Sequence, residues 1–186
     1  DHAVTLLGLA HQHLAAGLTG FEVMGQFALS LVDRHFAQMR VPLFRDTPWC
    51  VLLENSDHES ETHARAQFER LLEMAMEQGC VTDAVMAENI TQARALWGIR
   101  ESIPLAQPLE GPNIKHDVSI PVSSIPAFVR ATDALLTAAI PGVRLVNFGH
   151  LGDGNLHYNV QAPEGGDALA FLREREDDVN TLVFDS

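Results

Sequence analysis

The feature that most constrains the fold of this chain is a glycine-containing turn between two strand-like runs. Asp153-Gly154 separates the apolar runs 143–150 and 156–160. Both turn residues accept a positive φ, so this dipeptide is a strong signal for a two-residue β-hairpin. A hairpin requires an antiparallel strand pair. With the turn at these two residues, the register predicts that His150 lies directly opposite His157 on one face of the sheet.

The rest of the chain alternates between helix-like and strand-like segments. Apolar residues spaced three and four apart predict helices over 2–16, 27–39, 56–77, 91–103, 123–139 and 168–183. Short apolar runs predict further strands over 21–24, 49–54, 82–86 and 114–121. Prolines and a glycine predict a loop over 104–113. This order indicates an α+β fold in which helices pack on a largely antiparallel sheet.

Composition excludes several classes of protein. The 186 residues include 12 basic and 25 acidic side chains, for a formal net charge of −13. So acidic a chain does not bind nucleic acid by neutralising phosphates, and it is not attracted to an anionic membrane surface. Its two cysteines form no disulfide framework, and they favour a reducing, cytoplasmic location. No apolar run approaches the roughly 20 residues of a membrane-spanning helix.

The strongest candidates for metal ligands are His150 and His157. Across the predicted hairpin their Cβ atoms would lie about 4.5–5.5 Å apart, where two imidazoles can ligate one divalent cation. Asn159 falls on the same face, two residues further along the strand. The residues alone leave a metal site and a pair of ordinary sheet histidines equally open.

Two basic residues are candidates for binding a carboxylate. Lys115, the only lysine of the chain, shares a predicted strand face with Asp117 and Ser119. A solvated lysine at the sheet edge is the simpler interpretation. Arg100 lies toward the end of the predicted helix 91–103. There it can bind a carboxylate in bidentate fashion or interact with the helix dipole, and spacing does not decide between the two.

A further group of histidines and acids falls in the first turns of the predicted helix 56–77. It comprises His58, Glu59, Glu61 and His63. Acidic residues at a helix start interact favourably with the helix dipole. We therefore interpret this group as a solvated helix surface and not as a metal site.

Three segments of the sequence resemble blocks of one known family. The segment 149–159 closely resembles the glycine-rich signature of the FAD-linked oxidases. More narrowly, it is similar to the C-terminal, substrate-binding domain of the D-2-hydroxy acid dehydrogenases, which act on D-lactate, D-2-hydroxyglutarate or glycolate. The segments 96–103 and 115–121 resemble two further blocks in the same order. The resemblance implies a ferredoxin-like α+β sandwich, with helices on one face of the sheet, that closes over a flavin.

The resemblance also implies roles for individual residues. His150 and His157 are similar to ligands of a divalent metal, zinc or a similar ion. Arg100, Lys115 and Asn159 are similar to contacts of the substrate. The turn residues implied to lie near the flavin are Gly152, Asp153, Gly154 and Asn155.

Residues 1–186 are accordingly expected to form the C-terminal cap domain of an FAD-dependent D-2-hydroxy acid dehydrogenase. The FAD-binding domain and a final Glu-His-Gly segment are expected to lie outside this sequence, so the chain alone should be inactive. The expected partners are FAD with its domain, a divalent metal and a 2-hydroxy acid. A second copy of the chain and a membrane-associated electron acceptor stay open as partners. The alternative is a free-standing module that binds metal and carboxylate without redox chemistry.

Overall fold

The computed structural model describes residues 1–57 and 59–186, which form a six-stranded sheet flanked by helices. The strands are β1 (Leu18–Gly25), β2 (Trp49–Asn55), β3 (Asn113–Ile114), β4 (Asp117–Ser119), β5 (Arg144–His150) and β6 (Asn155–Gln161). The helices are α1 (His2–Leu14), α2 (Gln26–His35), α3 (Glu61–Glu77), α4 (Ile90–Ala106), α5 (Ile125–Ala139) and α6 (Ala168–Phe184). The strand order is β2-β1-β5-β6-β3, with β4 also paired to β6. Every strand pair among the described residues is antiparallel.

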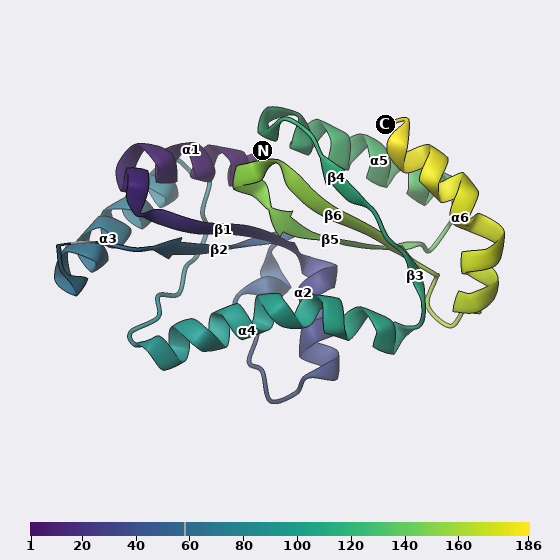
Figure 1. Ribbon diagram of the computed structural model, residues 1–186, viewed down its shortest axis with the longest axis horizontal. Coiled ribbons are helices and arrows are strands. Elements are labelled where there is room, and N and C mark those ends of the chain that lie inside the picture. Colours follow the sequence, from purple (N-terminus) through teal and green to yellow (C-terminus); the bar gives the residue numbers. More distant parts are fainter. Residues whose placement is uncertain (58) are drawn as a thin grey trace.

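Helices cover both faces of the sheet (Figure 1). α1, α3, α5 and α6 lie on one face, and α2 and α4 lie on the other, which we call the α4 face. Phe21 and Val23 of β1 pack into the core of the first face, while Met24 packs into the core of the α4 face.

The α+β class and the antiparallel sheet are thus confirmed, but the expectation of helices on one face is wrong. The continuous apolar run 49–53 shows why, because its alternate residues enter both cores. A strand that is apolar on both sides must be covered on both sides. The molecule therefore has three layers, where the ferredoxin-like sandwich has two.

The predicted hairpin joins β5 and β6, but its register differs from the prediction. Phe148, and not His150, pairs with His157. The connection is longer than two residues, because Leu151–Asp153 forms a turn of 3₁₀ helix that buries Leu151. His150 instead pairs with Glu22 of β1. The two histidines are therefore diagonal neighbours on one face, about 7–8 Å apart in a regular sheet.

Two other predicted segments also differ. The stretch 82–86 is irregular and not a strand. The predicted loop 104–113 is largely helical, since α4 continues through Pro104 to Ala106 and a 3₁₀ helix, η3 (Gln107–Glu110), follows. Ile103 and Ala106 are completely buried, so their packing outweighs the backbone hydrogen bond that a proline cannot donate.

The predicted strand 114–121 is divided into the short strands β3 and β4. Its alternation is as predicted, because Lys115, Asp117 and Ser119 are exposed whereas Ile114 and Val118 are buried.

Both cysteines are free, as the sequence predicts. Burial raises the pKa of the Cys50 thiol and of the Cys80 thiol. A bilayer-spanning helix, one long and apolar enough for that role, does not occur in the described parts of the chain.

Candidate functional site

The residues predicted to bind metal and substrate lie along the α4 face of the sheet. Alternation along β5 and β6 puts His150, His157 and Asn159 on this face. β3 and β4 pair with β6 in the same register. When this register is continued through the residues between β3 and β4, Lys115 lies opposite Asn159. Arg100 reaches the same face from α4, which crosses it (Figure 1). Candidates that are up to 59 positions apart in the sequence therefore share one surface of the sheet.

A buried carboxylate that the sequence did not reveal lies between two of these residues. Glu22 on β1 is only 2% exposed. Its Oε2 accepts a hydrogen bond from Nε of Arg100 at 2.7 Å, and its Oε1 contacts Nδ1 of His150. The available signal was an acidic residue inside the apolar run 21–24, at a position that alternation assigns to a buried face.

Arg100 binds a carboxylate, but the partner in this structure belongs to the chain itself. The residue is 8% exposed and lies more than one turn before the end of α4, so the helix dipole does not explain it. Its guanidinium lies over the Phe148 ring, with Cζ 4.8 Å from the ring centroid. Within the described residues only Nε is hydrogen-bonded, which leaves both Nη groups for an anionic ligand.

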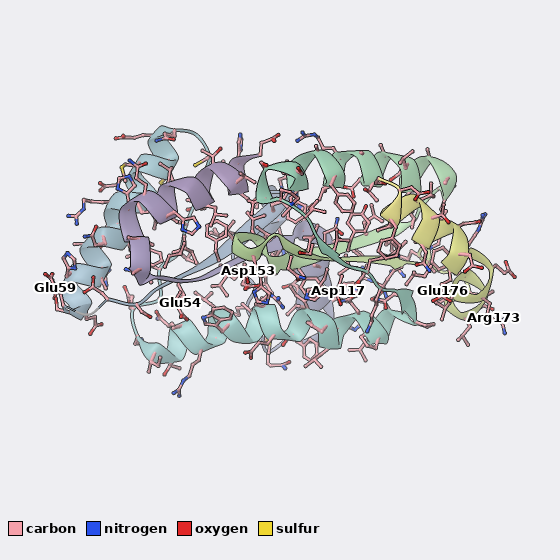
Figure 2. All side chains as sticks on the ribbon, turned by 45° about the horizontal axis from the view of Figure 1, so that its top comes forward. Glu54, Glu59, Asp117, Asp153, Arg173 and Glu176 are labelled. Atoms are coloured by element: carbon pink, nitrogen blue, oxygen red, sulfur yellow. The ribbon has the colours of Figure 1, made fainter. Side chains whose placement is uncertain are left out.

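His157 is held in a similar way by Asp117. Its Nδ1 is hydrogen-bonded to Oδ1 of Asp117, which pairs with it across β4 and β6. The centroid of its ring lies 4.6 Å from the centroid of the Phe148 ring, so Phe148 contacts both His157 and Arg100. Figure 2 shows Asp117 on the side of the sheet toward α4.

Each of the two imidazoles keeps one ring nitrogen available for a ligand. Nδ1 of His150 and Nδ1 of His157 each contact a carboxylate. No hydrogen bond within the described chain uses Nε2 of either ring, and a histidine oriented in this way ligates metal through Nε2. No third His, Cys, Asp or Glu among the described residues completes a group with them, whereas a catalytic zinc site has three protein ligands.

Lys115 and Asn159 differ in how free they are to meet a ligand. Lys115 is exposed and forms no ion pair within the described residues. Asn159 is buried, with Nδ2 donating to Oε1 of Gln107 at 2.9 Å and Oδ1 accepting the backbone N–H of His116 at 3.2 Å. A substrate contact by Asn159 would have to replace one of these bonds, and its role stays a prediction.

The turn after His150 has a backbone that requires glycine. Gly154 has φ of 70°, and a Cβ there would lie 2.2 Å from the carbonyl oxygen of Ile120. This close approach accounts for the glycine without any cofactor. The proximity of residues 152–155 to a flavin stays a prediction.

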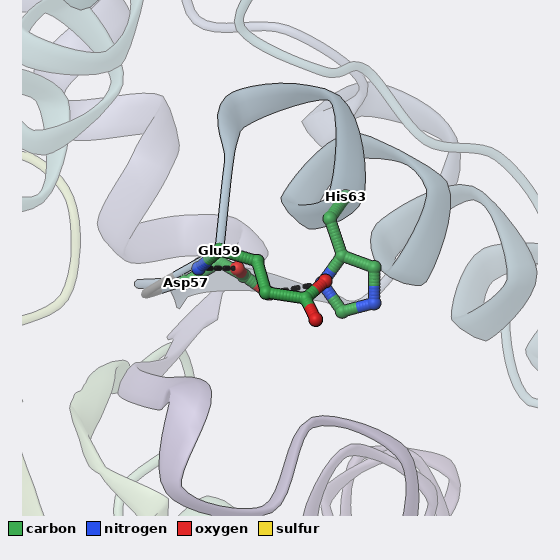
Figure 3. A group of neighbouring side chains, drawn as sticks. All are labelled: Asp57, Glu59 and His63. Atoms are coloured by element: carbon green, nitrogen blue, oxygen red, sulfur yellow. Dashed lines mark hydrogen bonds and ion pairs between the residues drawn. The ribbon is translucent and has the colours of Figure 1, made fainter.

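A second group of histidine and acids lies at the start of α3 (Figure 3). Nδ1 of His63 is 2.7 Å from Oδ2 of Asp57 and 3.2 Å from Oε2 of Glu59, and the three ligand atoms lie within 4.8 Å of one another. The backbone N–H of Glu59 donates to Asp57, which is the main cause that holds the pKa of Asp57 below its usual range.

These contacts are those of a helix start. Ser60 caps α3 by accepting the backbone N–H of His63, and the Glu59 side chain is 74% exposed. The Asp57 side chain, in contrast, is only 14% exposed, so a fully solvated helix surface stays a prediction. His58 lies outside the described residues.

Comparisons with known proteins point to one family. The family described as FAD linked oxidases, C-terminal domain, matches residues 1–184. The chain is similar to a D-2-hydroxyglutarate dehydrogenase of Xanthomonas citri pv. viticola, with 40% identity over 157 residues, or 83% of this chain and 32% of that protein. It is also similar to the mitochondrial D-2-hydroxyglutarate dehydrogenase of Arabidopsis thaliana, with 35% identity over 169 residues, or 91% of this chain and 30% of that protein.

A third relative has a different name. A putative mitochondrial D-lactate dehydrogenase of Schizosaccharomyces pombe is 34% identical over 157 residues, or 80% of this chain and 30% of that protein. The chain thus spans about a third of the length of these curated relatives. Because the family match extends over nearly the whole chain, this protein belongs to the family of FAD linked oxidase C-terminal domains.

Proposed function

We propose that this domain binds the substrate in an FAD-dependent dehydrogenase that oxidises a D-2-hydroxy acid to the 2-oxo acid. The observation that carries the proposal is the cluster on the α4 face, where Arg100, His150 and His157 converge around Glu22 and Phe148. The names of the relatives add the substrate class, D-2-hydroxyglutarate or D-lactate. Since the chain spans about a third of those proteins, the flavin and its domain would come from another part of the enzyme.

Arg100 and Lys115 would bind the carboxylate of the substrate. The two Nη groups of Arg100 match the two oxygens of a carboxylate in a bidentate, charge-assisted pair. Lys115 would add a mobile point charge from the exposed edge of the site. The Arg100 guanidinium lies over Phe148 and is largely shielded from water, and this strengthens its attraction for an anion.

Nε2 of His150 and Nε2 of His157 would hold a divalent metal, with zinc as the first candidate. Such an ion supplies Lewis-acid chemistry that lowers the pKa of a bound hydroxyl, and a flavin supplies the electron acceptor. The contribution of this chain would be orientation, because Arg100 and the two histidines hold the carboxylate and hydroxyl ends of the substrate on one rigid sheet.

Lys115→Met tests the substrate role, because Lys115 is exposed and its loss leaves no buried charge unpaired. In the enzyme that contains this domain and its flavin domain, kcat/KM for D-lactate or D-2-hydroxyglutarate should fall roughly 10- to 200-fold. This range corresponds to losing a hydrogen bond to a charged group, about 1.5–3 kcal/mol. Steady-state kinetics with both substrates measures the effect. Arg130→Met, which removes an exposed cation on α5, is the control. Unchanged kcat/KM in Lys115→Met for every substrate would remove Lys115 from the site.

Zinc titration of this chain, followed by calorimetry, tests the metal role. Binding should be weak, because the described residues offer two imidazoles, and it should be lost in His150→Ala and in His157→Ala. His63→Ala is the control, because it removes the histidine of the cluster at the start of α3. Loss of zinc binding in the His63 variant alone would move the metal site to α3 and contradict the proposal.

A further inference from the structure

Both oxygens of the buried Glu22 carboxylate are taken by residues of the candidate site. Oε2 accepts the Nε–H of Arg100 at 2.7 Å, and Oε1 contacts Nδ1 of His150. The two partners come from α4 and β5, and His150 is also the residue that pairs with Glu22 across the sheet. Because Glu22 is only 2% exposed, water cannot replace either partner in its hydrogen bond to the carboxylate.

The contact with Glu22 determines which ring nitrogen of His150 carries the proton. If Nδ1 carried no proton, its lone pair would face a lone pair of the carboxylate oxygen and the two would repel each other. Nδ1 must therefore be the donor. A neutral imidazole that is protonated at Nδ1 keeps its acceptor lone pair at Nε2. The His150 side chain is 53% exposed, so this Nε2 can meet a ligand from outside the chain.

We infer that Glu22 is a positioning residue that couples His150 to Arg100. This inference rests on the proposed function, which gives those two residues the metal and the substrate carboxylate. Glu22 acts through both neighbours: it holds His150 as the Nδ1–H tautomer, and it binds Nε of Arg100 so that the Nη edge is left for the ligand. The metal ligand and the carboxylate anchor are thereby oriented by one side chain.

The partner of His157 makes a useful contrast. Asp117 also contacts Nδ1 of its histidine, but its side chain is 73% exposed. Water competes for an exposed pair and weakens it. Asp117 should therefore orient His157 less strictly than Glu22 orients His150.

Glu22→Gln is the sharpest test, because it keeps the shape of the side chain and changes one oxygen into an NH₂ group. The Arg100 guanidinium has no acceptor, so it must face the remaining oxygen of the amide. The NH₂ group then faces Nδ1 of His150 and requires an acceptor there. His150 should consequently change from the Nδ1–H to the Nε2–H tautomer. The ¹⁵N shifts of the His150 ring, recorded by NMR at about pH 8.5 where an ordinary imidazole is neutral, report this change.

The same variant should weaken zinc binding. Partners of metal-ligating histidines typically contribute 10- to 100-fold to metal affinity, and we expect a loss in this range for Glu22→Gln by calorimetry. Glu54→Gln is the matched control. Glu54 is a carboxylate of β2 that accepts a hydrogen bond from Trp97 of α4 at 2.7 Å and contacts neither histidine of the site. It should leave zinc affinity and the His150 tautomer unchanged.

The outcomes separate this inference from the proposed function. If His150→Ala and His157→Ala bind zinc as the parent does, the metal role fails, while the ring shifts still decide what Glu22 does. If those variants lose zinc but Glu22→Gln keeps both the Nδ1–H tautomer and the parent affinity, Glu22 has no positioning role. Should the variant not fold, the parent alone is decisive, because an Nε2–H tautomer of His150 in the parent overturns the inference.

Discussion

Gly154 links the turn after His150 to Ile120, the residue that follows β4. Its N–H donates to the carbonyl of Leu151 at 3.0 Å, and its carbonyl accepts the N–H of Ile120 at 3.1 Å. Its φ of 70° belongs to the left-handed region. This single backbone conformation therefore fixes how β5, which carries His150, turns into β6, which carries His157.

Gly154→Ala should lower the free energy of unfolding by at least about 1–2 kcal/mol, because a Cβ is strained in the left-handed region. The clash at 2.2 Å with the carbonyl oxygen of Ile120 adds to this cost, since backbone must move. Urea unfolding measures the change. Gly152→Ala is the control, because its Cβ would have nothing within 4 Å, and it should change stability by no more than about 0.5 kcal/mol. Equal stability of the two variants would show that the turn is not constrained at Gly154.

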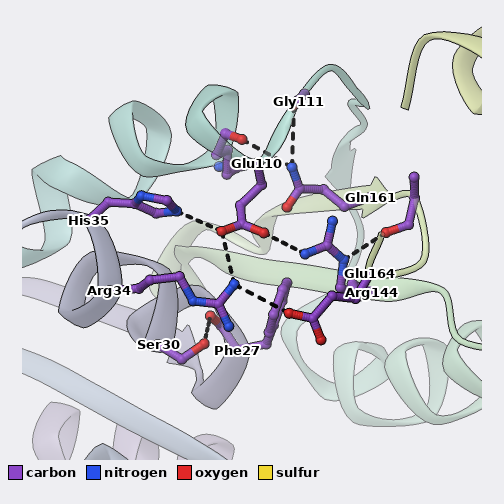
Figure 4. A network of polar contacts seen from close by, with 11 residues as sticks. Phe27, Ser30, Arg34, His35, Glu110, Gly111, Arg144, Gln161 and Glu164 are labelled. Atoms are coloured by element: carbon purple, nitrogen blue, oxygen red, sulfur yellow. Dashed lines mark hydrogen bonds and ion pairs between the residues drawn. The ribbon is translucent and has the colours of Figure 1, made fainter. Parts of the chain in front are cut away.

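Among the elements, η3 is joined to α2 and β5 by a cluster around Glu110 (Figure 4). Oε1 of Glu110 contacts Nε2 of His35 at 2.6 Å and Nη1 of Arg34 at 3.0 Å, and Oε2 contacts Nη1 of Arg144 at 2.5 Å. Burial alone would raise the pKa of Glu110. The hydrogen bonds from His35, Arg144 and Arg34 outweigh it and lower the pKa to about 2.

This cluster should make part of the stability depend on pH. Because the folded pKa of Glu110 is below its ordinary value of 4.5, its contribution is full above pH 4.5 and is lost as the pH falls toward about 2. At neutral pH, Glu110→Gln should lower the free energy of unfolding by about 1.5–3 kcal/mol, the contribution of a hydrogen bond to a charged group. Denaturant unfolding at several pH values should show the difference from the parent shrinking as the pH falls below 4.5.

The control for this prediction is Glu164→Gln. Glu164 is 3.8 Å from Arg34, and its side chain is 78% exposed, so its removal should have little effect at any pH. A Glu110 variant with the same stability deficit at every pH would contradict the linkage.

The whole molecule is held by two hydrophobic cores that share one sheet. The core between the sheet and α1, α3, α5 and α6 includes Leu136, and the core of the α4 face includes Ile103, both with no exposed surface. Since the same strands contribute alternate residues to each core, neither core can be lost while the sheet persists. The chain should therefore unfold as one cooperative unit.

Leu136→Ala and Ile103→Ala test this cooperativity, one in each core. Each should lower the free energy of unfolding by about 2–5 kcal/mol, the usual range for truncating a buried aliphatic side chain. In both variants the transitions followed by tryptophan fluorescence and by far-UV circular dichroism should coincide. Leu105→Ala, at a position 62% exposed, should change little. Separate transitions for the two probes would mean that the cores unfold independently.

Much of the fold and part of the site could be predicted from the sequence. All six helices of the described chain were expected near their observed positions, because the period of apolar residues, caps and glycines act within a few residues. The turn after β5 and the alternation of Lys115, Asp117 and Ser119 are local in the same sense. His150, His157, Arg100 and Lys115 are identifiable as candidates by residue type. Zinc as the bound metal, a homodimer and a cytoplasmic location stay predictions.

The tertiary structure alone decided how these parts meet. The register of β5 and β6 depends on the burial of Leu151, and the course of α4 through Pro104 depends on the burial of Ile103 and Ala106. The partner of Arg100 is 78 positions away in Glu22. Side-chain patterns specify which face of an element is apolar, but they do not specify which element covers it. The sequence by itself therefore determined most of the elements and the candidate residues, and only packing across the α4 face determined that a buried carboxylate joins two of them.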